Sequence, residues 1–409
     1  MPKSLTYACI SCASSRTVPV LSLGNTPLAN ALLSGAQLGA EEPRFPLDLV
    51  FCEDCALVQI TERVPPEQLF AEYPYFSSFS DTMVAAAKEL SRRIARASCL
   101  GPKSLVMEIA SNDGYLLQHY VAAGIPVLGI EPARNIARVA DRRGIRTRSE
   151  FFGLDLARRL KDEGLSADVV HANNVLAHVP DLNGFVEGLA VVLKPGGVAV
   201  IEVPYVRDLV ARCEFDTIYH EHLCYFSVSA LHSLFARHGL DLVDIERISV
   251  HGGSLRVFAS RSGGTGASVK RLLEEEHASG VNRLAYYAGF AEAVSGLRAD
   301  LLALLRSLKG DGKRIAAYGA SAKGSTLLNF FGIGSESLDY VVDRSTEKQG
   351  KFTPGTKLPI HSPEKLRQDK PDYLLLLAWN HLEEVLAQQA AYRAAGGKFI
   401  VPVPEVQII

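Results

Sequence analysis

The sequence has no excess of basic residues, which argues against a protein that coats nucleic acid. Its 409 residues include 43 Lys and Arg against 45 Asp and Glu, a formal net charge of -2. A nucleic-acid surface normally shows a basic excess or basic clusters, because Lys and Arg neutralise the phosphates. The composition therefore gives no support for a general nucleic-acid-binding function.

Long apolar runs are also missing. No uninterrupted apolar stretch approaches the roughly 20 residues that a membrane helix needs. The first residues, MPKSLTYACISCASS, have no apolar core of the kind found in signal peptides. Hydrophobic residues make up 47% of the chain and charged residues 22%, which is typical of a packed core. We expect a soluble, cytoplasmic protein of two or three domains.

Three familiar nucleotide-site motifs are absent as well. The chain has neither the glycine pattern G-x-G-x-x-G nor the Walker A pattern G-x-x-x-x-G-K-[ST]. The Tyr-x-x-x-Lys base pair of short-chain dehydrogenases is also missing. These absences disfavour an NAD-dependent dehydrogenase or epimerase and a P-loop enzyme.

Cysteine is scarce, but its spacing is informative. Seven cysteines are an odd number, and four of them form two Cys-x-x-Cys pairs: Cys9 with Cys12, and Cys52 with Cys55. Zinc prefers thiolate sulfur and takes four ligands in structural sites. Four cysteines leave no open position for catalysis, so we predict a structural zinc remote from the chemistry, in a module of residues 1–75. The alternative is four free or redox-active thiols.

After this module, short apolar runs alternate with helical patterns. Residues 78–98 predict an amphipathic helix capped by Ser80 or Asp81. Strand-like segments follow at 104–110, 126–132, 167–174, 198–204, about 240–248 and 254–261. After a charged helical stretch at 265–308 the alternation begins again, from 313 to the end of the chain. The pattern predicts α/β folds with doubly wound, mostly parallel sheets, in domains of residues 76–262 and 263–409.

The turn after the strand 104–110 is a candidate nucleotide site. In open α/β sheets, a turn of small residues between a parallel strand and a helix is where nucleotides bind. SNDGYLL supplies such a turn with the single glycine Gly114. Glu108 ends this strand and Glu131 ends the next, where ribose hydroxyls are commonly bound. For Glu131, the alternative is a carboxylate that caps the following helix.

Together these motifs resemble a known family. E-x-A-x-N-D-G, GIEP, NNVLAHVPD and LKPGG are similar to class I S-adenosylmethionine methyltransferases. The order of the four-cysteine module, this domain, YHEH, HGGSLR and GASAKG resembles the nucleotide-sugar C-methyltransferases of deoxysugar biosynthesis. These enzymes methylate a carbon, typically carbon 3, of a dTDP-4-keto-deoxysugar.

The resemblance implies a class I methyltransferase fold between the zinc module and a Rossmann-like C-terminal domain. It also implies S-adenosylmethionine as cofactor, structural zinc, a nucleotide-sugar substrate and a monomer. The implied cofactor-binding residues are Glu108, Ala110, Asn112, Asp113, Gly114, Tyr115, Glu131, Asn173 and Asn174.

The segment TIYHEHLCYFS carries the candidate chemistry. Methylation beside a ketone requires removal of an α-proton, for which a neutral imidazole is suited. The enolate then needs a donor such as a phenol or a second imidazole, and a carboxylate could orient an imidazole or bind sugar hydroxyls. By the resemblance, His222 is the base, with Tyr219 and Glu221 beside it, and His178 and one tyrosine of YPYFSSFS, Tyr73 or Tyr75, are further candidates.

Two other interpretations of YHEH remain: a metal site and a polar surface loop. The metal site is disfavoured because residues two apart diverge on a helix or strand and no further Asp/His cluster lies nearby. His220 itself is interpreted as structural.

The C-terminal motifs are candidates for substrate binding. YGASAKGSTLLN predicts a strand, a turn and a helix whose start can receive phosphate oxygens, with Ser321 and Lys323 in the turn. HGGSLR adds His251 and Arg256, the latter facing either a diphosphate or a packing carboxylate. The first turn could instead be a packing turn without a ligand. Two other functions remain open: an NAD-dependent nucleotide-sugar dehydrogenase or epimerase, and an inactive zinc-containing scaffold.

Overall fold

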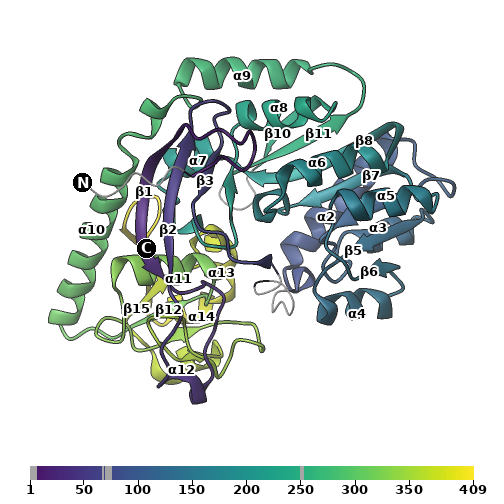
Figure 1. Cartoon of the computed structure of the whole chain (residues 1–409). Coiled ribbons are helices and arrows are strands. Elements are labelled where there is room, and N and C mark those ends of the chain that lie inside the picture. Colours follow the sequence, from purple (N-terminus) through teal and green to yellow (C-terminus); the bar gives the residue numbers. More distant parts are fainter. Residues whose placement is uncertain (1–6, 67–68, 70–75, 249–252) are drawn as a thin grey trace.

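The structure is a computed structural model that describes residues 7–66, 69, 76–248 and 253–409. In this part of the chain the longer strands form three sheets (Figure 1). The first sheet is built mainly from N-terminal residues, the second from the middle of the chain and the third from its C-terminal part. The two expected α/β sheets are therefore present, preceded by a small β-sheet module.

The first sheet is antiparallel and takes its last strand from far along the chain. It contains β1 (Thr17–Thr26), β2 (Phe45–Cys52), β3 (Val58–Ile60) and β9 (Cys224–Tyr225). Val58 pairs with Tyr225, and the N–H of Ile60 donates to the carbonyl of Leu223 at 3.0 Å. The cysteine module is thus completed by the strand that directly follows the YHEH segment.

The second sheet has the order β10-β11-β8-β7-β4-β5-β6. β4 to β8 run parallel, and β11 is antiparallel to both β8 and β10. Its strands are β4 (Val106–Ile109), β5 (Val127–Ile130), β6 (Thr147–Arg148), β7 (Ala167–Asn173), β8 (Leu193–Pro204), β10 (Asp241–Ile248) and β11 (Ser254–Ser260). β4 lies between β5 and β7, where the strand order reverses, so its carboxyl end is the expected ligand position.

Helices connect these strands, as the alternation predicted. They are α2 (Asp81–Ala97), α3 (Leu117–Ala122), α4 (Arg134–Arg142), α5 (Leu154–Asp162), α6 (Leu182–Val192), α7 (Val206–Ala211) and α8 (Val228–Arg237). Ser80 is the N-cap of α2, and its side chain accepts a hydrogen bond from the N–H of Met83 at 3.3 Å. Of the two expected caps, the serine is therefore the one used.

The third sheet has the order β14-β13-β12-β15-β16-β17, parallel except for the last strand. It contains β12 (Ile315–Tyr318), β13 (Val341–Val342), β14 (Ile360–His361), β15 (Tyr373–Leu376), β16 (Lys398–Val401) and β17 (Gln407–Ile408). Its helices are α11 (Ala322–Phe331), α12 (Glu364–Asp369), α13 (Leu382–Gln388) and α14 (Ala390–Ala394).

Two helices join the second sheet to the third. These are α9 (Ala267–Ser279) and the long α10 (Phe290–Gly310), as the charged helical stretch predicted. α10 and α11 both contact β1, so the first module packs against the C-terminal part as well as completing its sheet with β9. The strands β6, β14 and β17 have two residues each and were not predicted, because so short a pairing leaves no periodic pattern. No helix in the described ranges is both long and apolar enough to span a bilayer.

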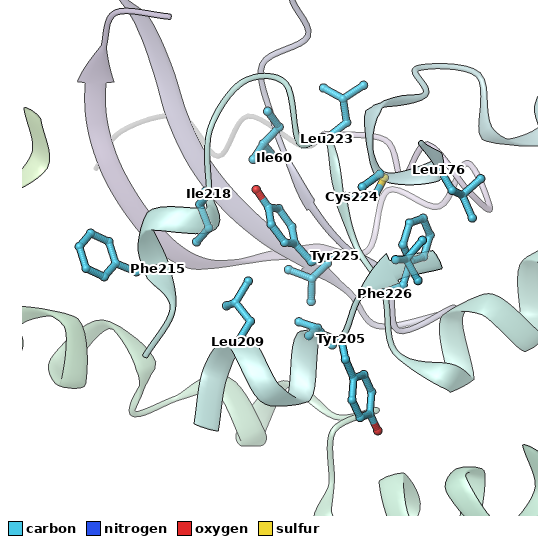
Figure 2. Close-up of a cluster of buried hydrophobic side chains, with 14 of the residues drawn as sticks. Ile60, Leu176, Tyr205, Leu209, Phe215, Ile218, Leu223, Cys224, Tyr225 and Phe226 are labelled. Atoms are coloured by element: carbon cyan, nitrogen blue, oxygen red, sulfur yellow. The ribbon is translucent and has the colours of Figure 1, made fainter. Parts of the chain in front are cut away.

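A buried apolar cluster lies where the first module meets the second domain (Figure 2). It brings Ile60 of β3 together with Leu176, Tyr205 and a row of residues from 215 to 226. Ile218, Leu223, Tyr225 and Phe226 are each at most 4% exposed. Burial of such side chains is worth about 1.5–3 kcal/mol each, so the YHEH segment is anchored at both ends.

Candidate active site and metal centre

The four paired cysteines converge on one point. Their sulfur atoms all lie within 4.8 Å of one another, with 3.5 Å between Cys9 and Cys55 and 3.6 Å between Cys12 and Cys52. A tetrahedral zinc with Zn–S bonds of about 2.3 Å places its sulfurs roughly 3.8 Å apart. The donor set therefore fits a zinc ion, and it consists of thiolates alone.

Both cysteine turns have the same backbone form. The residue after each second cysteine donates its N–H to the carbonyl of the first: Ala13 to Cys9 at 2.8 Å, and Ala56 to Cys52 at 2.9 Å. Both alanines have a φ of +59°, the left-handed region. Each turn thus curls its two sulfurs toward the same side, which explains why distant pairs can share one ion. Through β3 and β9 the module is linked to the segment that ends at His222, a link that the sequence did not suggest.

A cavity of about 890 Å³ opens at the carboxyl end of the second sheet. Residues from three parts of the chain line it: Asn30 from the first module, residues between 77 and 222 from the second domain, and Ser321, Lys323, Lys348, Asn380 and His381 from the third. A single ligand in this cavity can therefore touch all three parts.

Six of the predicted cofactor-binding residues line this cavity. They are Ala110, Asn112, Tyr115, Glu131, Asn173 and Asn174. Glu131 is 5% exposed, and its carboxylate accepts from the N–H groups of Asn112 at 2.9 Å and Ala133 at 2.8 Å. Burial raises the pKa of Glu131, although these two N–H groups oppose the shift. The carboxylate thus supports the turn and also faces the cavity.

The other three cofactor candidates lie behind the cavity wall. Glu108 is 1% exposed, and burial raises its pKa well above the usual value, with Glu131 and Asp113 adding to the shift. Asp113 is buried and forms an ion pair with Arg143 at 3.0 Å, while Ser78 donates to it. Gly114 has a φ of +82°, and a Cβ there would lie 2.0 Å from Cδ1 of Ile145. These residues shape the turn and do not line the cavity.

The cavity would suit S-adenosylmethionine, the cofactor expected from the sequence, in two further respects. Oδ1 of Asn173 is buried and has no hydrogen-bond partner within the described ranges. A ligand N–H or O–H would supply the missing bond, since leaving such an acceptor unpaired is costly. Phe151, Phe152 and Leu154 add an apolar wall. No sequence pattern singled out these three residues, because they lie in and just after the loop that joins the two-residue strand β6 to α5.

His222 is held by two hydrogen bonds of known direction. Its Nδ1 lies 2.9 Å from the carbonyl oxygen of Thr217, and its Nε2 lies 2.8 Å from the hydroxyl of Tyr219. A carbonyl can only accept, so Nδ1 carries the proton and the Nε2 lone pair accepts from Tyr219. The group that orients the imidazole is therefore a backbone carbonyl, where the sequence had suggested a carboxylate.

His178 lies next to this pair. The rings of His178 and His222 are 4.7 Å apart in an edge-to-face arrangement. Burial lowers the pKa of His178 to about 4, against the opposing effect of hydrogen bonds to the backbone of Glu221 and Asn174. His178 is thus neutral near pH 7 and does not oppose a positive charge on His222.

Glu221 faces away from the histidines, toward the first module. Both of its carboxylate oxygens accept from the Asn30 amide, at 2.8 Å each. Burial raises the pKa of Glu221 to about 7, while Asn30 and Lys348 oppose the shift. His220 is 1% exposed, and its Nε2 lies 3.1 Å from the carbonyl of Pro46. The expectation that His220 is structural agrees with this placement.

In the C-terminal part, the expected turn reaches the cavity. Ser321 is the N-cap of α11, where its hydroxyl accepts from the N–H of Gly324 at 3.1 Å. Lys323 follows, with its Nζ 4.5 Å from the ring centroid of Trp379. Lys348, also at the cavity, donates to the carbonyl of Ala320 at 2.8 Å. No sequence pattern singles out Lys348 or Asn30, because their partners are remote in the chain.

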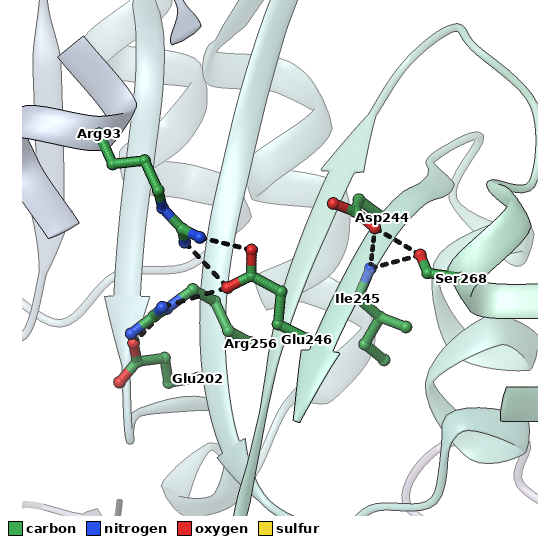
Figure 3. Close-up of polar contacts among 7 residues, drawn as sticks. All are labelled: Arg93, Glu202, Asp244, Ile245, Glu246, Arg256 and Ser268. Atoms are coloured by element: carbon green, nitrogen blue, oxygen red, sulfur yellow. Dashed lines mark hydrogen bonds and ion pairs between the residues drawn. The ribbon is translucent and has the colours of Figure 1, made fainter. Parts of the chain in front are cut away.

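Arg256 is placed differently from its expected role in substrate binding. It does not line the cavity and pairs instead with Glu202 at 2.7 Å and Glu246 at 3.2 Å, while Arg93 also binds Glu246 (Figure 3). The alternative of packing carboxylates is therefore the one the structure contains. His251, Tyr73 and Tyr75 lie outside the described residues.

Comparisons with known proteins cover nearly the whole chain. Family models match at residues 9–70 ("Putative zinc binding domain"), 84–245 ("Methyltransferase domain") and 249–404 ("C-methyltransferase C-terminal domain"). The C-methyltransferase NovU of Streptomyces niveus is 37% identical over 404 residues, 98% of this chain and 96% of that protein. A ubiquinone biosynthesis O-methyltransferase of Bordetella avium (strain 197N) is 28% identical over 94 residues, 22% of this chain and 39% of that protein.

Likeness to solved structures is partial. The magnesium protoporphyrin IX methyltransferase ChlM of Synechocystis PCC 6803, with bound SAM, is 15% identical at a TM-score of 0.34, covering 44% of this chain and 79% of that one. The PH0226 protein of Pyrococcus horikoshii OT3 is 15% identical at a TM-score of 0.37, covering 48% and 98%.

Proposed function

Because this chain belongs to the C-methyltransferase family, as its 37% identity to NovU over 98% of its length shows, we propose a specific reaction for it. The enzyme transfers a methyl group from S-adenosylmethionine to carbon 3 of a dTDP-4-keto-deoxysugar. The observation that carries the proposal is the hydrogen-bonded chain Thr217–His222–Tyr219 in the cavity that Asn112 and Glu131 also line. The two other functions left open by the sequence, an NAD-dependent enzyme and an inactive scaffold, have no support in these matches.

We assign the domains as expected from the sequence: residues 1–75 hold zinc, 76–262 hold the cofactor, and 263–409 contribute to nucleotide-sugar binding. When bound, S-adenosylmethionine supplies an electrophilic methyl group on a sulfonium. Glu131 would bind the ribose hydroxyls, and Asn112, Asn173 and Asn174 would hold the rest of the cofactor from the ends of β4 and β7. Ser321 and Lys323 would contact the sugar nucleotide.

The α-proton of the ketone is removed by the His222–Tyr219 pair. The carbonyl of Thr217 fixes the imidazole in the Nδ1–H form, so Nε2 is the basic nitrogen. Since the Tyr219 hydroxyl occupies that nitrogen, the proton reaches Nε2 through this hydroxyl: the phenol takes the α-proton while passing its own to His222. Neutral His178 beside them lets the imidazolium form without repulsion.

The direct test is mass spectrometry of dTDP-4-keto-deoxysugars after incubation with the enzyme and S-adenosylmethionine. A gain of one methylene unit on carbon 3 is expected, and the absence of a methylated product with every such sugar would refute the proposed substrate class.

The base assignment is tested by exchange of the α-proton with deuterium from solvent, using the demethylated cofactor in place of the methyl donor. General-base catalysis is worth about 10²- to 10⁴-fold, so His222→Ala should lose exchange by that factor while both ligands still bind. A relay through the phenol predicts a comparable loss in Tyr219→Phe. A mild effect of Tyr219→Phe beside a large effect of His222→Ala would mean that His222 takes the proton directly.

A further inference from the structure

A buried cation lies in the same cavity as the proposed base. Lys323, in the first turn of α11, lines the cavity together with Tyr219 and His222. Its Nζ is buried and has no hydrogen-bond acceptor within the described ranges, although it lies over the Trp379 ring. An ammonium group has three donors, and burying them without acceptors is costly. The site is therefore complete only when an acceptor enters from the cavity.

The charges around Lys323 indicate what kind of acceptor fits. Asp216 and Glu214 lie close enough to favour the charged form of the lysine, against burial, which lowers its pKa. Asp216 is 0% exposed; its Oδ2 accepts from Nε1 of Trp379 at 2.7 Å, and its Oδ1 has no partner in the described part of the chain. A diphosphate would bring permanent negative charge into a buried pocket where burial already raises the pKa of both acids, to about 8 for Glu214. A carbonyl oxygen, neutral before reaction and negative only during it, suits the site better.

The position of Lys323 relative to His222 is fixed by packing. Asp216 and Thr217 belong to η4 (Phe215–Thr217), and the carbonyl of Thr217 is the one that orients His222. α11 contacts η4, and the hydroxyl of Thr326 on α11 donates to the carbonyl of Ile218 at 3.2 Å. His222 and Lys323 are thus both held in place by η4 and the residue that follows it.

Several of the other donors near His222 are already engaged. The Tyr219 hydroxyl donates to His222, and the His178 ring is bonded to the backbone of Glu221 and Asn174. Lys348 donates to the carbonyl of Ala320. The hydroxyl of Thr217 also lines the cavity and has no partner within the described ranges, but it is neutral. A negative enolate oxygen is better stabilised by Lys323, a cavity-lining cation that lacks an acceptor.

We propose that Lys323 is a catalytic residue that donates a hydrogen bond to the ketone oxygen of the substrate and to the enolate oxygen formed from it. This inference rests on the proposed function. As the α C–H bond breaks, its proton goes to the Tyr219–His222 pair, its electron pair forms the C=C bond, and the carbonyl π pair moves onto oxygen beside Lys323. The carbonyl then re-forms as the α-carbon bonds to the methyl group, and the methyl–sulfur bonding pair stays on sulfur.

Lys323→Met removes the charge and keeps most of the length of the side chain. Loss of one donor to a developing oxyanion typically costs about 10²- to 10³-fold in turnover, and the same loss is expected in α-proton exchange. dTDP alone, which has the diphosphate but no ketone, should bind within about twofold of wild type. Lys365→Met is a matched control, because Lys365 also lies over an aromatic ring, that of Tyr340, and does not line the cavity.

Folding of the variant can be followed at the site itself. The chain has one tryptophan, and Trp379 is that residue. Loss of the charge above the ring can shift the emission maximum even in a folded protein. A cooperative, wild-type-like thermal transition in Trp379 emission, together with wild-type affinity for S-adenosylmethionine, would therefore show that Lys323→Met is folded. If that folded variant exchanged the α-proton at the wild-type rate, the inference would be wrong.

A second result would also overturn it: dTDP binding that weakens as much as turnover, which would place Lys323 on the diphosphate. Failure of the proposed function looks different. Wild-type enzyme would then neither exchange the α-proton nor methylate any nucleotide keto-sugar, whatever residue stands at position 323.

Discussion

Replacing Arg256 by methionine separates a structural role from a role in substrate binding. Arg256 has a side-chain exposure of 14% and its partner Glu202 of 8%, so the pair is almost fully removed from water. Methionine fills much of the same space but leaves the Glu202 carboxylate uncompensated. Glu246 loses less, because Arg93 still binds both of its carboxylate oxygens, at 2.6 and 2.9 Å.

The size of the effect follows from this burial. Removing one partner of a buried ion pair typically costs about 3–5 kcal/mol. For a domain of this size, that corresponds to a fall in melting temperature on the order of 10 °C. Arg93→Met should cost only about 0.2–1 kcal/mol, because the Arg93 side chain is 43% exposed.

The assay is thermal unfolding of wild type and variants, combined with the KM for the sugar nucleotide. The double variant Arg256→Met/Glu202→Leu should recover much of the lost stability, since an apolar pair of similar volume often replaces a buried ion pair without loss. A folded Arg256→Met protein with unchanged melting temperature and a raised KM would refute the reasoning and return Arg256 to the substrate site.

Three further predictions follow from the site. Cys9→Ser leaves only three of the four thiolates of the zinc site. Elemental analysis should then find less than one zinc per chain, and the melting temperature should fall. Full zinc content with unchanged stability would contradict this. Glu131→Ala should weaken S-adenosylmethionine binding, measured by calorimetry, about 10- to 100-fold, because hydrogen bonds to a charged group are worth that much. Binding of dTDP should change much less. Equal weakening of both ligands would mean that the carboxylate only supports the fold. Burial raises the pKa of Glu221 from 4.5 to about 7, so the folded protein keeps a proton that the unfolded chain releases and stability falls as pH rises through this window. Glu221→Gln should flatten that fall in urea titrations at several pH values, and an unchanged slope would exclude Glu221 as its source.

The sequence predicted the features that depend on local pattern. Alternation of apolar strands and amphipathic helices predicted both α/β sheets, because β4, β5, β7 and the second half of β8 are largely buried apolar runs. The two Cys-x-x-Cys pairs predicted the thiolate cluster for a similar reason: the ligands come as local turns, and zinc accepts only a few donor types.

Features that depend on distant contacts were not predictable in this way. Asn30 reaches Glu221 across 191 positions, and an asparagine in a loop carries no pattern that indicates a partner. Arg256 had two equally plausible partners in the sequence, and only the register of β11 with β8, which places it opposite Glu202, decides between them. The role of Gly114 likewise depends on Ile145, which approaches it from a different element.

The strand β9 has a consequence for synthesis of the protein. The first module cannot close its sheet when its own residues emerge, because the partner of β3 lies at Cys224–Tyr225. At about 5–20 residues per second, that strand follows roughly 10 to 30 s later. Until then, β3 exposes an unpaired edge made of Val58, Gln59 and Ile60, residues that are at most 2% exposed in the finished fold. An open apolar edge is a template for association, so a fragment ending at residue 75 should aggregate even when its zinc site is filled.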